Sequence, residues 1–265
     1  MPQDRFSLLL YHTCFLGCFL GLTSTLYFLA GVTGHIGNSL LNAITAFFVF
    51  LAALFFLYIF FVSMLDKSRL GILIWFLILL VLLAEFVLGF VPPVARDELI
   101  HHLAIPKLYL QAGRIIEISF ALHSYYPMLL DMLYTPFVKW GWDSVPKLIH
   151  GLFGFLTGLL LYAYLARRLN PVYGLLGFVL FVSIPMILRL SNLAYVDLGL
   201  TFYSSASLLC LLRWLEDVKA RRWLILSGLS AGFALATKFN GLLVSLLLFL
   251  FLAFILGREK ERSIR

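Results

Sequence analysis

Long apolar runs alternate with short polar segments along most of the chain. The runs cover residues 6–30, 43–62, 71–91, 148–165, 172–190, 196–214 and 223–256. A helix needs about 20 apolar residues to cross the hydrocarbon core of a bilayer. The pattern therefore predicts an all-α fold, a polytopic membrane helical bundle in which the runs are the spans.

The last run is too long for one crossing. Its 34 residues would form a helix of about 51 Å, against a hydrocarbon core of roughly 30 Å. Residues 237–241 interrupt it with a lysine, an asparagine and a glycine. We therefore expect two short helices, 223–236 and 241–256, and about eight spans in all.

Composition and charge agree with a membrane protein. The chain is 62% hydrophobic and 12% charged with a mean hydropathy of +1.00, whereas soluble domains are roughly 25% charged. The net charge of +7 does not indicate nucleic-acid binding, because the basic residues form short clusters between apolar runs. With eight spans and a cytoplasmic N-terminus, 13 of the 20 basic residues lie on the cytoplasmic side. We expect both termini to be cytoplasmic.

The segment 92–147, which this topology places outside, differs in composition from the other connections. It holds five of the 13 acidic residues and three of the six histidines. Connections of this length are commonly functional. Pro92 and Pro93 end the third span, and residues 97–113 show rough helical spacing of apolar residues that Pro106 divides in two. We expect short amphipathic helices at the membrane surface.

Two carboxylates in this loop are candidates for chemistry. Asp97 and Glu98 are each followed four residues later by a histidine, His101 and His102, so each pair shares a helix face. A carboxylate at the lipid–water boundary could accept a proton from a substrate. The alternative is a helix cap made of solvated charges, and the spacing alone leaves both open.

Further charged residues are expected on the same side of the membrane. Asp197 begins the sixth span, Lys238 lies in the break of the last run, and Arg189 closes the fifth span. Cations on the outer side could bind a phosphate group, although Arg189 could instead snorkel to lipid phosphates. Glu85 lies within the third span, where a carboxylate is either functional or hydrogen-bonded to a neighbouring helix.

Four stretches, taken in order, resemble a known family. They are Arg96-Asp97-Glu98, His123-Ser124-Tyr125-Tyr126-Pro127-Met128, Ala194-Tyr195-Val196-Asp197 and Gly232-Phe233-Ala234-Leu235-Ala236-Thr237-Lys238. They resemble the C superfamily of polytopic glycosyltransferases, in the branch of the protein O-mannosyltransferases and bacterial aminoarabinose transferases. The resemblance spans residues 71–256, about 70% of the chain, and leaves two N-terminal spans in residues 1–70 outside the pattern.

The resemblance implies roles for named residues. Asp97 corresponds to the catalytic base, with Glu98 beside it as a second catalytic candidate. The candidate substrate-binding residues are Lys238, Asp197, Arg189, His101, His102 and Tyr126. Many relatives have a lysine just before the proline of the second motif, where this chain has Tyr125 and Tyr126. The resemblance implies no cofactor and no metal, with a metal held by Asp97, His101 and His102 as the alternative.

The expected function is transfer of a sugar from a polyprenyl-phosphate donor to a lipid, glycan or protein acceptor. The resemblance implies a multi-pass protein of the cell inner (cytoplasmic) membrane, with the active loop outside. Family members usually continue with more spans, so we expect residues 71–265 to be the N-terminal portion of such a core, completed by further spans or a partner subunit. The alternative is a non-catalytic protein, either a lipid-linked sugar transporter or a membrane assembly subunit.

Overall fold

A computed structural model describes residues 2–63 and 68–264, with side chains over 5–63 and 68–257. The described residues form helices and connecting segments, with no β-strand among them. The elements in chain order are α1 (Pro2–Val32), α2 (Ser39–Ser63), α3 (Arg69–Gly89), η1 (Glu98–His102), α4 (Ala104–Ala112), η2 (Leu122–Tyr125), α5 (Leu129–Lys139), α6 (Val145–Arg168), α7 (Pro171–Val182), α8 (Pro185–Ser191), α9 (Asp197–Glu216), α10 (Arg221–Thr237) and α11 (Asn240–Ile264). The predicted helical membrane bundle is confirmed.

Six described helices are long and apolar enough to cross a membrane, namely α1, α2, α3, α6, α9 and α11. The predicted fifth span is not a straight helix, because α7 and α8 are inclined by 69° at a short break, as in a broken span or a re-entrant loop. Pro185 at the start of α8 explains the break, since proline keeps the preceding residue out of helical conformation. The predicted seventh span, α10, has 17 residues, at the lower limit of a crossing helix.

The break in the last apolar run is confirmed. Helix α10 ends at Thr237, Lys238 is extended with φ −159° and ψ 147°, and α11 begins at Asn240. A Cβ atom on Gly241 would come within 2.3 Å of the Ala234 carbonyl oxygen. This turn therefore requires glycine at 241, because the two helices approach each other at backbone distance.

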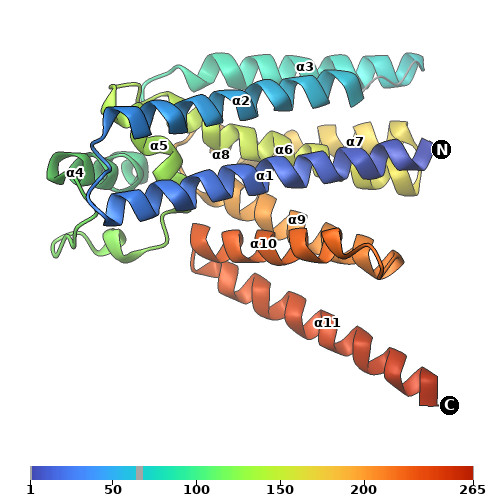
Figure 1. Cartoon of the computed structure of the whole chain (residues 1–265). Helices are drawn as coiled ribbons and strands as arrows, with labels where there is room; N and C mark the ends of the chain where they lie inside the picture. The colour runs from blue at the N-terminus through green and yellow to red at the C-terminus, as the bar shows by residue number, and fades with distance from the viewer. Residues whose placement is uncertain (1, 64–67, 265) are drawn as a thin grey trace.

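The connections gather at two opposite ends of the bundle (Figure 1). We call the end with residues 90–144 the α4 end. There the Ile115 N–H donates to the Gly31 carbonyl oxygen at 3.0 Å, and Lys139 donates to the Gly37 carbonyl oxygen at 2.6 Å. Both chain termini lie at the other end in Figure 1, where Arg167 pairs with Glu216 at 2.5 Å. Which end faces outside the cell stays a prediction.

The two N-terminal spans are part of the same bundle. Helix α1 packs against α2, α5, α6 and α10, and the Tyr203 hydroxyl on α9 donates to the Gly17 carbonyl oxygen at 2.9 Å. Helix α11, by contrast, packs against only α10 and α9 among the described elements and leans away from the bundle (Figure 1). The division of the chain near residue 70 stays a prediction.

The first loop folds into η1, α4, η2 and α5. Helix α4 has the expected amphipathic character, with Ile105 and Tyr109 buried. The expectation that Pro106 breaks the helix is wrong: Pro106 lies in the first turn of α4, where its missing N–H costs nothing, and the break is at Leu103. Helix α5 was not expected, and its residues 129–138 are all buried against α1, α2, α4 and α6.

Candidate functional site

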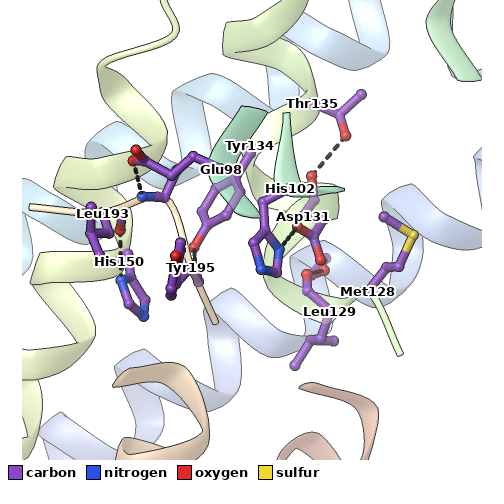
Figure 2. A network of polar contacts seen from close by, with 12 residues as sticks. Glu98, His102, Met128, Leu129, Asp131, Tyr134, Thr135, His150, Leu193 and Tyr195 are labelled. Atoms are coloured by element: carbon purple, nitrogen blue, oxygen red, sulfur yellow. Dashed lines mark hydrogen bonds and ion pairs between the residues drawn. The ribbon is translucent and has the colours of Figure 1, made fainter. Parts of the chain in front are cut away.

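Glu98 connects two segments that are almost 100 residues apart. Its side chain is fully buried, and its Oε2 accepts hydrogen bonds from the N–H groups of Val94 at 3.2 Å and Ala95 at 2.9 Å. Its Oε1 accepts from the Ala194 N–H at 2.7 Å (Figure 2). A buried carboxylate is tolerated when such donors satisfy it. Glu98 therefore holds the start of the first loop against the connection between α8 and α9.

Asp97 has the opposite environment. It precedes η1, its side chain is exposed, and its carboxylate makes no hydrogen bond or ion pair with any residue that the structure describes. It is not the predicted helix cap, because no backbone N–H donates to its side chain. Its carboxylate is thus free to meet a substrate, while its neighbour Glu98 fixes the backbone that carries it.

His102 and Asp131 form a buried pair. The Nδ1–H of His102 donates to Oδ1 of Asp131 at 2.7 Å, and Asp131 is fully buried in α5 (Figure 2). Oδ2 of Asp131 is also buried, and it has no hydrogen-bond partner among the described residues. Sequence reasoning missed Asp131 as a site residue, because it lies 29 residues from His102 with no shared periodicity.

His101 lies in a row of aromatic rings. Its ring centroid is 4.0 Å from that of His102 and 4.8 Å from that of His123. The row continues from His123 to Tyr126 at 5.3 Å and from Tyr126 to Phe239 at 5.4 Å. Burial, with the neighbouring His102, lowers the pKa of His101 to about 4, so its ring is neutral at physiological pH. Its buried Nε2 has no hydrogen-bond partner in the described part of the chain.

A third histidine fixes the connection between α8 and α9. The Nδ1–H of His150, on α6, donates to the carbonyl oxygens of Leu190 at 2.9 Å and Leu193 at 2.8 Å. Its Nε2 accepts from the Leu198 N–H at 2.9 Å, which requires the neutral ring with hydrogen on Nδ1. The Tyr134 hydroxyl on α5 also donates to this connection, at the Tyr195 carbonyl oxygen.

Asp197 and Lys238, which the sequence places only on the same side of the membrane, form an ion pair. The Lys238 ammonium donates to Oδ1 of Asp197 at 2.7 Å, joining the start of α9 to the turn between α10 and α11. The two side chains are 42% and 34% exposed. Solvent therefore reaches both partners, and the ammonium remains accessible to another anion.

The remaining candidates are Arg189, Glu85 and the alternative metal site. Arg189 is exposed on α8, and its charge acts on Tyr195, whose phenol pKa burial raises. Glu85 is buried and accepts a hydrogen bond from the Asn192 side chain, which agrees with a bond to a neighbouring helical segment. No group of three or more His, Cys, Asp or Glu side chains in the described ranges is arranged to hold a metal ion, so the alternative metal site is not formed there.

The gathered motifs can be compared with known protein families. Residues 145–264 match the family model of dolichyl-phosphate-mannose-protein mannosyltransferase. This match agrees with the resemblance found in the third and fourth motifs, which carry Asp197 and Lys238. The matched range begins with α6, so the first loop with Asp97, Glu98 and His102 lies outside it.

No curated protein and no solved structure matches the chain significantly. The family match and the apolar helices together support the prediction of a multi-pass membrane glycosyltransferase.

Proposed function

We propose that this chain transfers a sugar from a polyprenyl-phosphate donor to an acceptor hydroxyl on the outer face of the inner membrane. The observation that carries the proposal is the gathering of the four motifs at the α4 end. Glu98 binds the Ala194 N–H, and three residues further along the chain Asp197 binds Lys238. These two contacts connect the backbone that carries the exposed carboxylate of Asp97 with the segment that carries the accessible ammonium of Lys238.

The proposed reaction needs a base and a stabilised leaving group. Asp97 accepts the proton of the acceptor hydroxyl while that oxygen forms a bond to the anomeric carbon of the sugar. The bond from the anomeric carbon to the phosphate oxygen breaks, and its electron pair stays on the polyprenyl phosphate. The Lys238 ammonium, with Arg189 as a second cation, stabilises the charge on the departing phosphate.

Glu98 is proposed here as a positioning residue for Asp97. Its two oxygens are both occupied by backbone donors, and no solvent reaches it. Because its side chain is fully buried, a substrate hydroxyl cannot reach it. The contacts of Asp97 and Glu98 therefore favour Asp97 as the residue that meets the substrate.

The decisive experiment is sugar transfer by Asp97→Asn in vesicles that contain the full protein and any partner it needs. We expect transfer to fall by about 10²–10⁴-fold while donor binding persists, because general-base catalysis is lost and the shape is kept. Asp143→Asn is the matched control, since Asp143 lies in the same loop and, among the residues that the structure describes, pairs with Lys107 alone, at 2.8 Å. Near-normal transfer by Asp97→Asn would refute the role of Asp97.

The non-catalytic alternative has one observation in its favour. Broken helices are common at the binding sites of secondary transporters, and α7 and α8 meet at a break with a bend of 69°. Binding of the lipid-linked sugar by the wild-type assembly, with no transfer to any lipid, glycan or protein acceptor, would support this alternative.

A further inference from the structure

The buried pair of His102 and Asp131 has a consequence for substrate binding at the same site. Because a carboxylate oxygen can only accept, the hydrogen of a neutral His102 ring lies on Nδ1, toward Asp131 (Figure 2). Nε2 is then left with a lone pair, and it makes no hydrogen bond with any residue that the structure describes. A carboxylate that fixes a histidine tautomer in this way usually serves the function of the opposite ring nitrogen.

Two series of contacts connect His102 with the segment that contains Lys238. On one side the ring lies 5.6 Å from that of Tyr195, two residues before Asp197, which holds the Lys238 ammonium at 2.7 Å. On the other side the row of rings runs from His101 through His123 and Tyr126 to Phe239, which follows Lys238 in the chain. His102 thus lies in a surface, formed by Tyr195 and the row of rings, that connects the first loop with Lys238, the candidate phosphate ligand.

A glycosyl phosphate bound at Lys238 would place its sugar beside this surface. Sugar hydroxyl groups donate hydrogen bonds, and the C–H faces of a sugar ring pack against aromatic rings. The ring row offers such faces, and Tyr126 and Phe239 are exposed. When its ring is neutral, His102 offers an acceptor at Nε2 whose direction Asp131 has already fixed, so little entropy is lost when a hydroxyl group binds it.

We propose that Nε2 of His102 accepts a hydrogen bond from a hydroxyl group of the donor sugar, with Asp131 as the residue that positions the ring. This inference rests on the proposed function, because it takes the ligand at Lys238 to be a lipid-phosphate sugar. It adds a recognition contact to the sugar itself, whereas Lys238 recognises the phosphate that all such lipids share.

Two substitutions of His102 separate this contact from the structural role of the pair. In His102→Asn the shorter amide can still donate to Asp131 from the position of Nδ1, but nothing replaces Nε2. In His102→Gln the longer side chain carries its amide to the position of Nε2, where its oxygen can accept a hydroxyl hydrogen. Thermal unfolding in detergent checks that both variants are folded, and the difference between their affinities measures the contact at the position of Nε2.

The experiment measures the affinity of the full protein in lipid nanodiscs for two probes, a short-chain polyprenyl-phosphate mannose and the same polyprenyl phosphate without the sugar. We expect His102→Asn to weaken binding of the mannosyl lipid by roughly 5- to 150-fold, the effect of one lost hydrogen bond to a buried group. Binding of the sugar-free lipid should change by less than about threefold. His102→Gln should recover part of the affinity for the mannosyl lipid.

The outcomes separate the two proposals. If the wild-type protein binds the mannosyl lipid and His102→Asn binds it equally well, the sugar contact is refuted and the proposed function stands. If His102→Asn weakens binding of both probes equally, the effect is not on the sugar and the inference is also refuted. If the wild-type protein binds neither probe, the proposal of a lipid-phosphate donor is refuted, and the proposed His102 contact is refuted as well.

Discussion

The α4 end contains two pairs of complementary side chains that differ in their exposure to solvent. His102 and Asp131 meet at 2.7 Å with side chains that are 7% and 0% exposed. Lys238 and Asp197 also meet at 2.7 Å, but their side chains are 42% and 34% exposed. The distances are equal, so the pairs differ in their donor, an imidazole or an ammonium, and in their exposure to solvent.

Burial decides how easily each pair can exchange partners. Removing one member of a buried pair leaves a polar or charged group without water to solvate it, which costs several kcal/mol. An exposed pair contributes only about 0–1 kcal/mol, because water replaces either partner at little cost. The first pair is suited to hold a fixed geometry, and the second is suited to release Lys238 to a phosphate.

Breaking the buried pair should have the largest effect on stability. We expect Asp131→Ala to lower the free energy of unfolding by about 1–3 kcal/mol, because it leaves the buried Nδ1–H of His102 without its acceptor. Denaturant unfolding in detergent micelles measures the change. Asp143→Ala, which breaks the exposed pair with Lys107, should cost less than about 1 kcal/mol. Equal losses in the two variants would remove the distinction between the pairs.

Acid should also destabilise the first loop, through His101. The pKa of His101 is lowered to about 4 in the folded protein, against about 6.5 in an unfolded chain. The contribution of neutral His101 is therefore fully present above pH 6.5 and is lost as the pH falls toward 4. The groups that act on it are His102, His123, Asp131 and Asp97.

The test compares unfolding temperatures of the wild-type protein and His101→Phe, which keeps an aromatic ring but cannot take a proton. Between pH 6.5 and 4 the variant should lose less stability than the wild-type protein. Parallel pH profiles would mean that other groups, such as the carboxylates, account for the acid sensitivity.

Opening the exposed pair should affect stability least and binding strongly. We expect Lys238→Ala to change the free energy of unfolding by less than about 1 kcal/mol. Its affinity for a polyprenyl-phosphate sugar should fall roughly 10- to 150-fold, because a charge-assisted hydrogen bond to phosphate is lost. Lys238→Arg should recover part of the affinity, as measured by titration of the reconstituted protein. A loss below about threefold would show that Lys238 does not hold the phosphate.

The sequence predicted the parts of the site that local patterns encode. The break at Lys238 was visible because a charge, an amide and a glycine interrupt an apolar run, and alternation of the spans brought Asp197 to the same side. Glu98 was also selected, but only as a charged neighbour of Asp97. Its buried position, with three backbone donors, follows from packing against a segment almost 100 residues away.

Other features left no local signal that sequence reasoning could use. Asp131 appeared as one of several acids in a polar loop, yet it lies in the buried helix α5 against α1 and α6. His150 appeared as part of a span, although its ring bonds the carbonyl oxygens of Leu190 and Leu193 and the N–H of Leu198. The break between α7 and α8 is the exception, because Pro185 is a local signal for it, although it lies inside the apolar run 172–190 that was taken as one span.

By itself the sequence determined a helical membrane protein, the division of its longest apolar run and the side of the bundle on which Asp97, Asp197 and Lys238 emerge. These features follow from the apolar runs and from the polar residues that interrupt them, which are local properties of a few turns of helix. Only the tertiary structure decided which polar groups are buried and with whom they bond. Pairs such as His102 with Asp131 depend on contacts between distant segments, and the free energy of burying a polar group depends on whether such a partner is present.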